Sequence, residues 1–412
     1  MNMTRRGCLK ATISGVLTIP LAPFSQARPR RSFCAAGANL SVVRRDNTIV
    51  RHGGNGDIFP MTWASNDRIF SSFSDGTGWR TGPAKNRNTR AIWIDGSPYT
   101  ASFHEIDAYE GPAEKSDEDP RYYGFGALAV GERLYQYLSC AERPSASGWG
   151  WNGVKLVYSD DDGRTWRNQD GSAPLVWESY EDRSRNSMLF FDEPQQAFSL
   201  VSLLQMGKNY STNRDGYVYG YGTNGNVDGS MNQLVMFRVP KDRLLERRAY
   251  GFFGGMKSGS EAIWVANIGD RVSIHTFPRG WVNTPREGQN VVQSWLPSVV
   301  YNATLGIYMM ANSGVGCPSD GDWFARSVPS YLGFWTSPSP WGPWTQIHEE
   351  LAWIPGGDTA ARCYSPQISP KWIAPDGKYF WLVWTDFQDK RDSVGNGQTY
   401  YAFNTQRFDL IG

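Results

Sequence analysis

Two aspartates near the start of the chain have the residue type and the spacing for acid–base chemistry. Asp57 precedes one apolar segment and Asp75 follows the next, and each lies nine residues from Asn66. With Asn66 at the centre of a hairpin turn, the two aspartates face each other at the open end. Their Cβ atoms then lie about 5 Å apart unless a bulge intervenes. Gly56 and Gly76 beside them suit a backbone that needs room or an unusual turn.

Carboxylates this close cannot both ionise freely. One is therefore expected to keep its proton and act as an acid, while the other acts as a base or nucleophile. Glycoside hydrolysis needs this division of labour. The structural alternative is that both residues cap turns on a loop rim, where Asp is common. Spacing alone leaves both interpretations open.

Polar side chains elsewhere are candidates for binding a sugar. One group precedes Tyr217, which we take as the start of an inner strand at a central funnel: Lys208, Asn209, Tyr210, Arg214 and Asp215. A second group precedes the last inner strand in the same way and offers partners for sugar hydroxyls: Arg362, Tyr364 and Gln367. The structural alternative for the first group is an arginine–aspartate pair that holds a loop.

Two tryptophans near the aspartates, Trp63 and Trp79, are candidate stacking platforms. Sugar rings present apolar C–H faces that pack on indole rings. The alternative is that both belong to the core.

Composition and missing motifs exclude several classes of function. Lys and Arg number 41 against 40 for Asp and Glu, so we expect no nucleic-acid partner and no attraction to a lipid surface. The four histidines form no H-E-x-x-H motif, and G-x-S-x-G is absent, which argues against a zinc protease and a serine-hydrolase elbow. We expect no required cofactor; calcium in the funnel and the oligomeric state are left open.

A two-stranded unit with a polar turn recurs five times along the chain. Its copies begin at Met61, Ala127, Ala197, Ser298 and Gln367. The 44 glycines, 24 prolines and the 18 Trp, 20 Tyr and 20 Phe residues suit many short strands joined by tight turns. The pattern predicts an all-β fold, a five-bladed β-propeller, and a β-sandwich is the structural alternative.

Residues 159–166 fit the Asp-box pattern S-x-D-x-G-x-T-W, which is typical of sialidase-type propeller blades. In such a turn, short polar side chains and glycine satisfy the backbone while the tryptophan packs beneath it. We therefore expect a structural role for this segment, away from the chemistry.

The first residues have the pattern of an export signal. Arg5-Arg6 precedes an apolar run at 11–21, and a small-residue cleavage site ends at Ala27. The run is too short and too rich in Thr, Ser and Gly to span a bilayer. We expect export by the twin-arginine route to the periplasm or the medium, with no membrane segment. The expected segments are a signal peptide at 1–27, an N-terminal lead-in at 28–53 and one catalytic propeller at 54–412.

Four cysteines follow the signal: Cys34, Cys140, Cys317 and Cys363. Their spacings match no zinc site. Disulfides and buried free thiols both remain open from the sequence.

Several motifs together resemble those of an exported propeller family that was long known only as a domain of unknown function. They are Gly-Asp-Ile-Phe-Pro-Met-Thr-Trp at 56–63, Phe-Ser-Asp-Gly at 73–76, Arg-Asp-Gly-Tyr-Val-Tyr at 214–219, Trp-Gly-Pro-Trp at 341–344 and Ser-Pro-Gln-Ile-Ser-Pro-Lys-Trp at 365–372. Members include endo-D-arabinanases of glycoside hydrolase family 183. The resemblance implies a five-bladed propeller that cuts α-D-arabinofuranosyl linkages in cell-wall arabinan, with Asp57 and Asp75 as the catalytic pair. Ile58 and Phe59 replace the usual Thr-Trp of the opening motif, so the sugar recognised can differ.

Three other functions remain as alternatives. A sialidase needs an F-R-I-P-like motif early in the chain, whereas Phe-Arg-Val-Pro lies at 237–240, after the Asp-box pattern. A polysaccharide lyase would need a base such as His104 or Lys208 beside a group that neutralises a uronate. A glycan-binding propeller without catalysis would need only aromatic residues on its rim. We predict a glycoside hydrolase that acts on a furanose polysaccharide.

Overall fold

The computed structural model describes most of the chain downstream of the expected signal. The described residues are 40–80, 87–107, 109, 120–143, 150–225, 231–259, 261–277, 290–292, 296–317, 329–386 and 403–412. The chain divides into two units, Met1–Cys34 and Ala35–Gly412. The first unit, and with it the expected signal peptide, lies outside the described residues.

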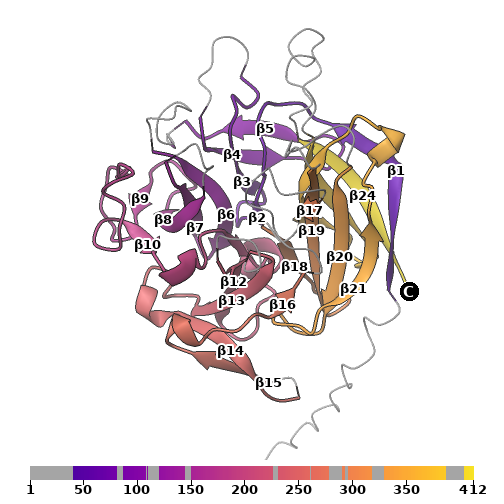
Figure 1. Cartoon of the computed structure of the whole chain (residues 1–412). Coiled ribbons are helices and arrows are strands. Elements are labelled where there is room, and N and C mark those ends of the chain that lie inside the picture. The colour runs from indigo at the N-terminus through magenta and orange to yellow at the C-terminus, as the bar shows by residue number, and fades with distance from the viewer. Residues whose placement is uncertain are drawn as a thin grey trace, which may run out of the picture. The chain divides into compact units, whose positions relative to one another are not determined.

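The described part of Ala35–Gly412 consists of β-strands and single turns of 3-10 helix, and five antiparallel sheets form (Figure 1). Blades 1 and 2 contain β2 (Met61–Trp63), β3 (Ile69–Phe73), β4 (Arg90–Asp95) and β5 (Ser102–Glu105), then β6 (Tyr122–Val130), β7 (Arg133–Ala141), β8 (Trp151–Ser159), β9 (Arg167–Asn168) and β10 (Leu189–Phe191). Blade 3 contains β11 (Val201–Leu203), β12 (Tyr217–Thr223), β13 (Gln233–Pro240), β14 (Gly251–Ser258), β15 (Glu261–Val265) and β16 (His275–Thr276).

Blades 4 and 5 complete the set. They contain β17 (Asn290–Val292), β18 (Ser298–Asn302), β19 (Ile307–Cys317), β20 (Tyr331–Ser337) and β21 (Thr345–Glu350), then β22 (Cys363–Ile373), β23 (Tyr379–Asp386), β24 (Asn404–Ile411) and β1 (Ser41–Arg51). The 3-10 turns are η1 (Pro194–Gln196), η2 (Lys208–Tyr210), η3 (Arg247–Ala249), η4 (Ile268–Asp270) and η5 (Pro355–Gly357). Among the described residues, no helix has the length and apolar character needed to cross a membrane.

The innermost strands of the five sheets form a closed ring. β2 contacts β6, β6 contacts β11, β11 contacts β18, β18 contacts β22, and β22 contacts β2. This arrangement confirms the five-bladed β-propeller and excludes the sandwich, which has two facing sheets. The five hairpins expected from the sequence are the two strands nearest the axis in each blade.

The ring is closed by the N-terminal strand, which differs from the expected lead-in at 28–53. The indigo β1 lies beside the yellow β24 as the outermost strand of blade 5, with Ser41 opposite Ile411 (Figure 1). A sheet built from both ends of the chain joins the first and last blades through backbone hydrogen bonds. Because β1 ends at Arg51, the short segment that follows it leads to blade 1 and carries Asp57 just before β2.

The core lies between neighbouring blades. The inner strands are buried on both faces, as in β3, where all five residues are buried. Phe70 and Leu138 pack between blades 1 and 2, whereas Phe59 and Trp381 pack between blades 1 and 5. Strands covered on both faces carry nearly continuous apolar runs, which is why alternation is weak in these segments.

Residues 159–166 form a compact turn between β8 and β9. The Gly163 amide donates to Ser159 Oγ at 2.8 Å, and the Thr165 amide donates to Asp161 Oδ1 at 2.8 Å. Trp166 is buried beneath the turn, and the Trp93 indole of blade 1 donates to the Asp162 carbonyl at 3.2 Å. The turn therefore helps to join blades 1 and 2.

Candidate active site at one end of the propeller axis

The predicted hairpin register holds along β2 and β3 but shifts where the aspartates lie. Met61 is opposite Ser71 and Trp63 is opposite Ile69, as a turn centred on Asn66 requires. Beyond β2, however, the Asp57 amide donates to the Ser74 carbonyl at 2.9 Å and the Ser74 amide donates back at 2.7 Å. Asp57 is thus opposite Ser74, one residue short of Asp75. The cause is Ile58, whose left-handed φ of 52° interrupts the strand between the two pairings.

Glycines permit this close pairing at the open end of the hairpin. A Cβ atom on Gly76 would lie 1.9 Å from the Asn55 carbonyl oxygen. One on Gly56 would lie 2.4 Å from the Phe73 ring. The expectation that the backbone needs room beside both aspartates is therefore confirmed.

Asp57 is almost buried, with 8% of its surface exposed. Its Oδ2 accepts a hydrogen bond of 2.7 Å from the hydroxyl of Tyr364. Tyr364 belongs to β22, so this contact connects blade 5 with blade 1 across the closure of the ring. From the sequence, Tyr364 was expected to contact a sugar hydroxyl. In the structure, its hydroxyl donates a hydrogen bond to Asp57, a candidate catalytic carboxylate.

Asp75 lies at the same open end of the hairpin and is half-buried. Its backbone has a left-handed φ of 50°, and its Oδ1 accepts a hydrogen bond of 3.1 Å from the Asn88 amide. The same amide group donates to the Tyr123 hydroxyl at 3.4 Å. Burial, followed by the negative charges of Asp75 and Asp57, raises the pKa of Tyr123 well above its usual value.

The negative charges of both aspartates, together with burial, thus favour the protonated phenol of Tyr123, while Arg121 acts in the opposite direction. Beneath them, a cluster of buried apolar residues draws on all five blades: Ile58, Tyr123, Leu200, Leu296 and Tyr364 are members. The site thus lies at the end of the propeller axis where the inner strands of blades 1, 2 and 5 begin. Two carboxylates beside a protonated phenol in a largely buried setting can divide acid and base roles.

Arg362 and Gln367 lie on or beside β22, near Tyr364, and both are buried. The Arg362 amide donates to Asp386 Oδ1 at 2.9 Å, and Arg51 of β1 forms an ion pair of 3.0 Å with the other oxygen of Asp386. The closing strand is therefore tied to the segment that carries Tyr364. Contact of Arg362 or Gln367 with sugar stays a prediction.

Trp79 lies at the aspartate end, where its indole nitrogen donates to the His52 carbonyl at 3.1 Å. Phe103 covers one face of the indole, with ring centroids 3.7 Å apart and planes 7° from parallel. Trp79 is half-buried and packs against the core between blades 1 and 5, and stacking of a sugar on it stays a prediction.

Trp63 of blade 1 and Lys208 of blade 3 meet at the end of the propeller opposite the two aspartates, and contact of either with a sugar stays a prediction. The turn between β2 and β3 carries Asp67, whose Oδ1 accepts from the Trp63 indole at 2.9 Å. Lys208 lies 3.3 Å from the same carboxylate, and Lys371 of β22 also reaches it at 3.3 Å. The hydrogen bond from Trp63, with help from both lysines, lowers the pKa of Asp67. Asp67 therefore joins blades 1, 3 and 5 at the end of the propeller opposite Asp57 and Asp75.

The remaining residues of the group before Tyr217 lie, like Lys208, in the turn between β11 and β12. The inner strand of blade 3 is β11, so this turn is at its far end rather than at its beginning. Asp215 is exposed and accepts from the Tyr217 amide at 3.0 Å, while Arg214 is also exposed. The buried Tyr210 accepts from the Tyr219 amide at 3.2 Å, and Asn209 has a left-handed φ of 52°. These are the contacts of a structural turn.

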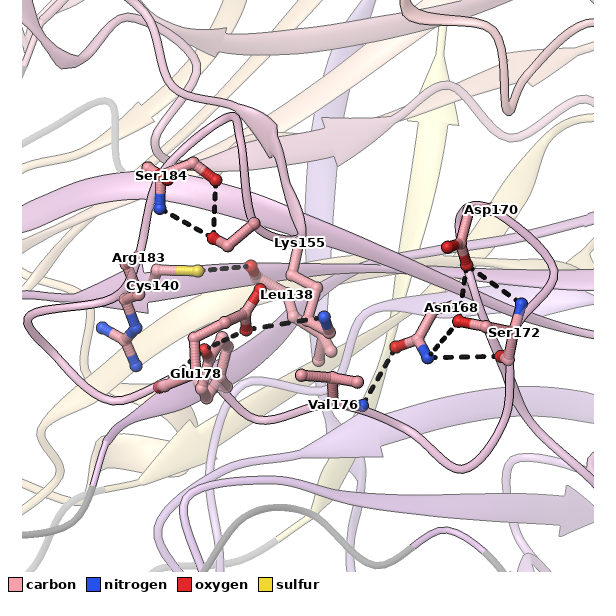
Figure 2. Close-up of polar contacts among 12 residues, drawn as sticks. Leu138, Cys140, Lys155, Asn168, Asp170, Ser172, Val176, Glu178, Arg183 and Ser184 are labelled. Carbon is pink, nitrogen blue, oxygen red and sulfur yellow. Dashed lines mark hydrogen bonds and ion pairs between the residues drawn. The ribbon is translucent and has the colours of Figure 1, made fainter.

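A buried charged cluster that includes Lys155 and Glu178 (Figure 2) contacts Tyr122, the first residue of β6, the strand that also carries Tyr123. The Tyr122 hydroxyl donates to Glu178 Oε2 at 2.6 Å, and Lys155 of β8 lies 3.5 Å from the same oxygen. Arg183 stacks over the Tyr122 ring at 4.1 Å and donates to the Arg121 carbonyl at 2.8 Å. Burial lowers the pKa of Lys155.

Two of the four cysteines have described side chains, and both are buried free thiols: Cys140 and Cys363. Burial raises the pKa of Cys140 to about 12. Cys34 and the side chain of Cys317 lie outside the described residues. Within the described ranges, no group of three or more His, Cys, Asp or Glu side chains gathers where it could hold a metal ion.

Sequence reasoning missed Asn88 and Tyr123. Tyr123 belongs to β6, in which every residue but the last is buried. Its sequence context therefore does not distinguish it from a core residue. Asn88 lies thirteen residues from the carboxylate that it contacts. Only the three-dimensional arrangement of blades 1 and 2 brings them together.

No protein-family model and no curated protein sequence matches this chain. Solved structures do resemble it. A crystal structure from Bacteroides ovatus has a TM-score of 0.49 and 13% identity, with 88% of this chain and 87% of that chain covered. The catalytic domain of a Coprinopsis cinerea GH62 α-L-arabinofuranosidase has a TM-score of 0.40 and 11% identity, covering 91% and 98%. An endo-arabinase from Bacteroides thetaiotaomicron has a TM-score of 0.38 and 13% identity, covering 87% and 94%.

Proposed function

We propose that this protein is a glycoside hydrolase that cleaves a furanose polysaccharide. The first candidate is the α-D-arabinan of cell-wall arabinogalactan or lipoarabinomannan, cut in endo mode. The observation that carries the proposal is that two carboxylates lie at one end of the propeller axis, where Tyr364 donates to Asp57 at 2.7 Å and the Asn88 amide donates to Asp75 at 3.1 Å and to Tyr123 at 3.4 Å. The motifs that resemble those of endo-D-arabinanases support the choice of sugar.

In this mechanism, one aspartate protonates the oxygen of the leaving sugar. The other either activates water or attacks the anomeric carbon. The Asn88 amide and the Tyr364 hydroxyl fix the two carboxylates, because each donates a hydrogen bond to one of them. No step in this scheme requires a cofactor.

The test is product release from arabinogalactan, sialyl-lactose and a uronate polymer by the wild type, Asp57→Asn and Asp75→Asn. We expect oligosaccharides from arabinan alone, reduced by about 10²- to 10⁴-fold in each variant, because a positioned acid or base contributes that much. Asp67→Asn, at the closed end of the same hairpin, is the matched control and keeps activity.

Other outcomes would replace the proposal. Unsaturated products from the uronate polymer would identify a lyase, and free sialic acid would identify a sialidase. Binding of arabinan without hydrolysis, unchanged in both variants, would identify a glycan-binding propeller.

We also propose export by the twin-arginine route. The Arg5-Arg6 pair within the expected signal supports this. Replacement of both arginines by lysine should retain the protein in the cytoplasmic fraction, and secretion that persists would contradict the proposal.

A further inference from the structure

We propose that Tyr364 is a positioning residue that keeps Asp57 in its charged form as the base or nucleophile, which assigns the acid role to Asp75. This inference rests on the proposed function and refines the mechanism of the same site. It replaces the sequence-based expectation that Tyr364 binds a sugar hydroxyl.

The hydrogen bond itself is the first support. A distance of 2.7 Å between the Tyr364 hydroxyl and Asp57 Oδ2 suits a hydroxyl that donates to a charged carboxylate. Asp57 and Tyr364 are 8% and 3% exposed, so water competes little for this bond. A hydrogen bond to the charged form of a carboxylate favours that form.

The backbone of β22 is shaped to aim Tyr364 at blade 1. The pairing of β22 with β23 is irregular between Tyr364 and Gln367. Ser365, within this irregularity, has a left-handed φ of 50°, and its amide donates to Ser313 Oγ of blade 4 at 3.1 Å. A bulge next to a site commonly redirects one side chain. The left-handed backbone of Ser365 and its hydrogen bond to Ser313 therefore fix the direction in which the neighbouring Tyr364 side chain points.

The second aspartate has a different setting. Asp75 is half-exposed and receives its bond from a neutral amide, that of Asn88, at 3.1 Å. The titratable and charged groups near Asp57 come from three blades: Tyr364 from blade 5, Asp75 from blade 1, and Tyr123 with Arg121 from blade 2. With Asp57 assigned as the base or nucleophile, the two-carboxylate mechanism leaves the acid role to Asp75. Access to solvent also suits the residue that must exchange its proton in each cycle.

The two possible roles of Tyr364 predict different kinetics. A positioning residue acts on the ionisation of Asp57, so Tyr364→Phe should lower kcat about tenfold and move the acidic limb of kcat/KM up by about one pH unit. A sugar-binding hydroxyl would raise KM and leave the limb in place. Tyr122→Phe is the matched control, because it removes a hydroxyl that donates to Glu178 at 2.6 Å, outside the site.

A second measurement does not depend on activity. In full-length protein labelled with ¹³C at the aspartate carboxyls, the Asp57 signal is the one missing from Asp57→Asn. We expect this signal to titrate at higher pH in Tyr364→Phe than in the wild type, and to be unchanged in Tyr122→Phe. Ser313→Ala, which loosens the aim of Tyr364, should give a smaller shift in the same direction.

The outcomes separate the two proposals. A shifted signal in a wild type that hydrolyses no glycan would retain the role of Tyr364 and reject the hydrolase. Hydrolysis with an unmoved signal and an unmoved acidic limb in Tyr364→Phe would reject the role of Tyr364 and retain the hydrolase. A rise in KM alone would return Tyr364 to sugar binding.

Discussion

Two buried carboxylates in this propeller each accept a hydrogen bond from a tyrosine, yet their surroundings differ. In blade 1, Asp57 accepts from Tyr364 at 2.7 Å, and in blade 2, Glu178 accepts from Tyr122 at 2.6 Å. Their exposed fractions are 8% and 6%. Burial and the tyrosine bond are therefore shared and cannot by themselves mark a site of chemistry.

The charges around the two carboxylates make the difference. Glu178 has a cation beside it, because Lys155 lies 3.5 Å away, and Arg183 stacks on the bonding tyrosine at 4.1 Å (Figure 2). Near Asp57 there is instead a second carboxylate, Asp75, and the negative charges of both act on Tyr123 together with the positive charge of Arg121. A compensated buried charge stabilises local structure, whereas neighbouring like charges separate the ionisation of two acids, as catalysis requires. The comparison teaches that a second carboxylate near the same buried phenol, rather than burial or a tyrosine hydrogen bond, distinguishes the candidate site from the supporting cluster.

The largest effect expected from this comparison is on stability. Glu178→Gln should lower the free energy of unfolding by about 3–5 kcal/mol, because it leaves Lys155 buried without its partner. Denaturant unfolding measures this loss, and activity per folded molecule should stay close to that of the wild type. Asp57→Asn, the matched change in blade 1, should instead lower activity by about 10²- to 10⁴-fold at little cost in stability. A catalytic loss in Glu178→Gln as large as that in Asp57→Asn would remove the distinction between the two regions.

A smaller effect is expected where the backbone shapes the aspartate end. Gly76→Ala would place a Cβ atom 1.9 Å from the Asn55 carbonyl oxygen, so the pairing that holds Asp57 must open. Overpacking of this kind costs about 1–3 kcal/mol, and activity should fall with it. Gly251→Ala in β14 is the control, because its Cβ would meet its nearest atom at an ordinary 3.7 Å. Equal thermal midpoints and activities for the two variants would contradict the role of Gly76.

The ring of hairpins could be predicted from the sequence because it depends on local patterns, and the same patterns place Asp57 and Asp75 at the open end of the first hairpin. A hairpin centred on Asn66 follows from spacing, and the register of β2 and β3 agrees with it. The shift at Asp57 could not be predicted, since a β-branched residue such as Ile58 rarely adopts a positive φ. Tertiary contacts over-determine that conformation.

Contacts between distant segments account for the other differences. The role of β1 depends on pairing between Ser41 and Ile411, at the two ends of the propeller. Lys208 was placed at the funnel because a polar loop before a strand looks the same at either end of a blade. Its ion pair with Asp67, 3.3 Å away, fixes the end only once blades 1 and 3 are assembled.

The smallest effect concerns pH and tests the supporting cluster alone. Burial lowers the pKa of Lys155 in the folded protein, so in the range just below pH 10.5 the unfolded chain binds more protons than the folded one. Stability contributed by Lys155 therefore rises as pH increases through this window. The buried Tyr122 has a raised pKa, so above about pH 10 the folded protein holds the extra proton and the contribution of Tyr122 to stability falls as pH rises.

Comparison with Lys155→Met isolates the lysine, because the tyrosine contribution is present in both proteins. The difference in unfolding free energy between wild type and Lys155→Met should shift in favour of the wild type from pH 8 to pH 10. A difference that does not change with pH would mean that Lys155 keeps the same protonation in the folded and unfolded states over this range, and that burial does not lower its pKa.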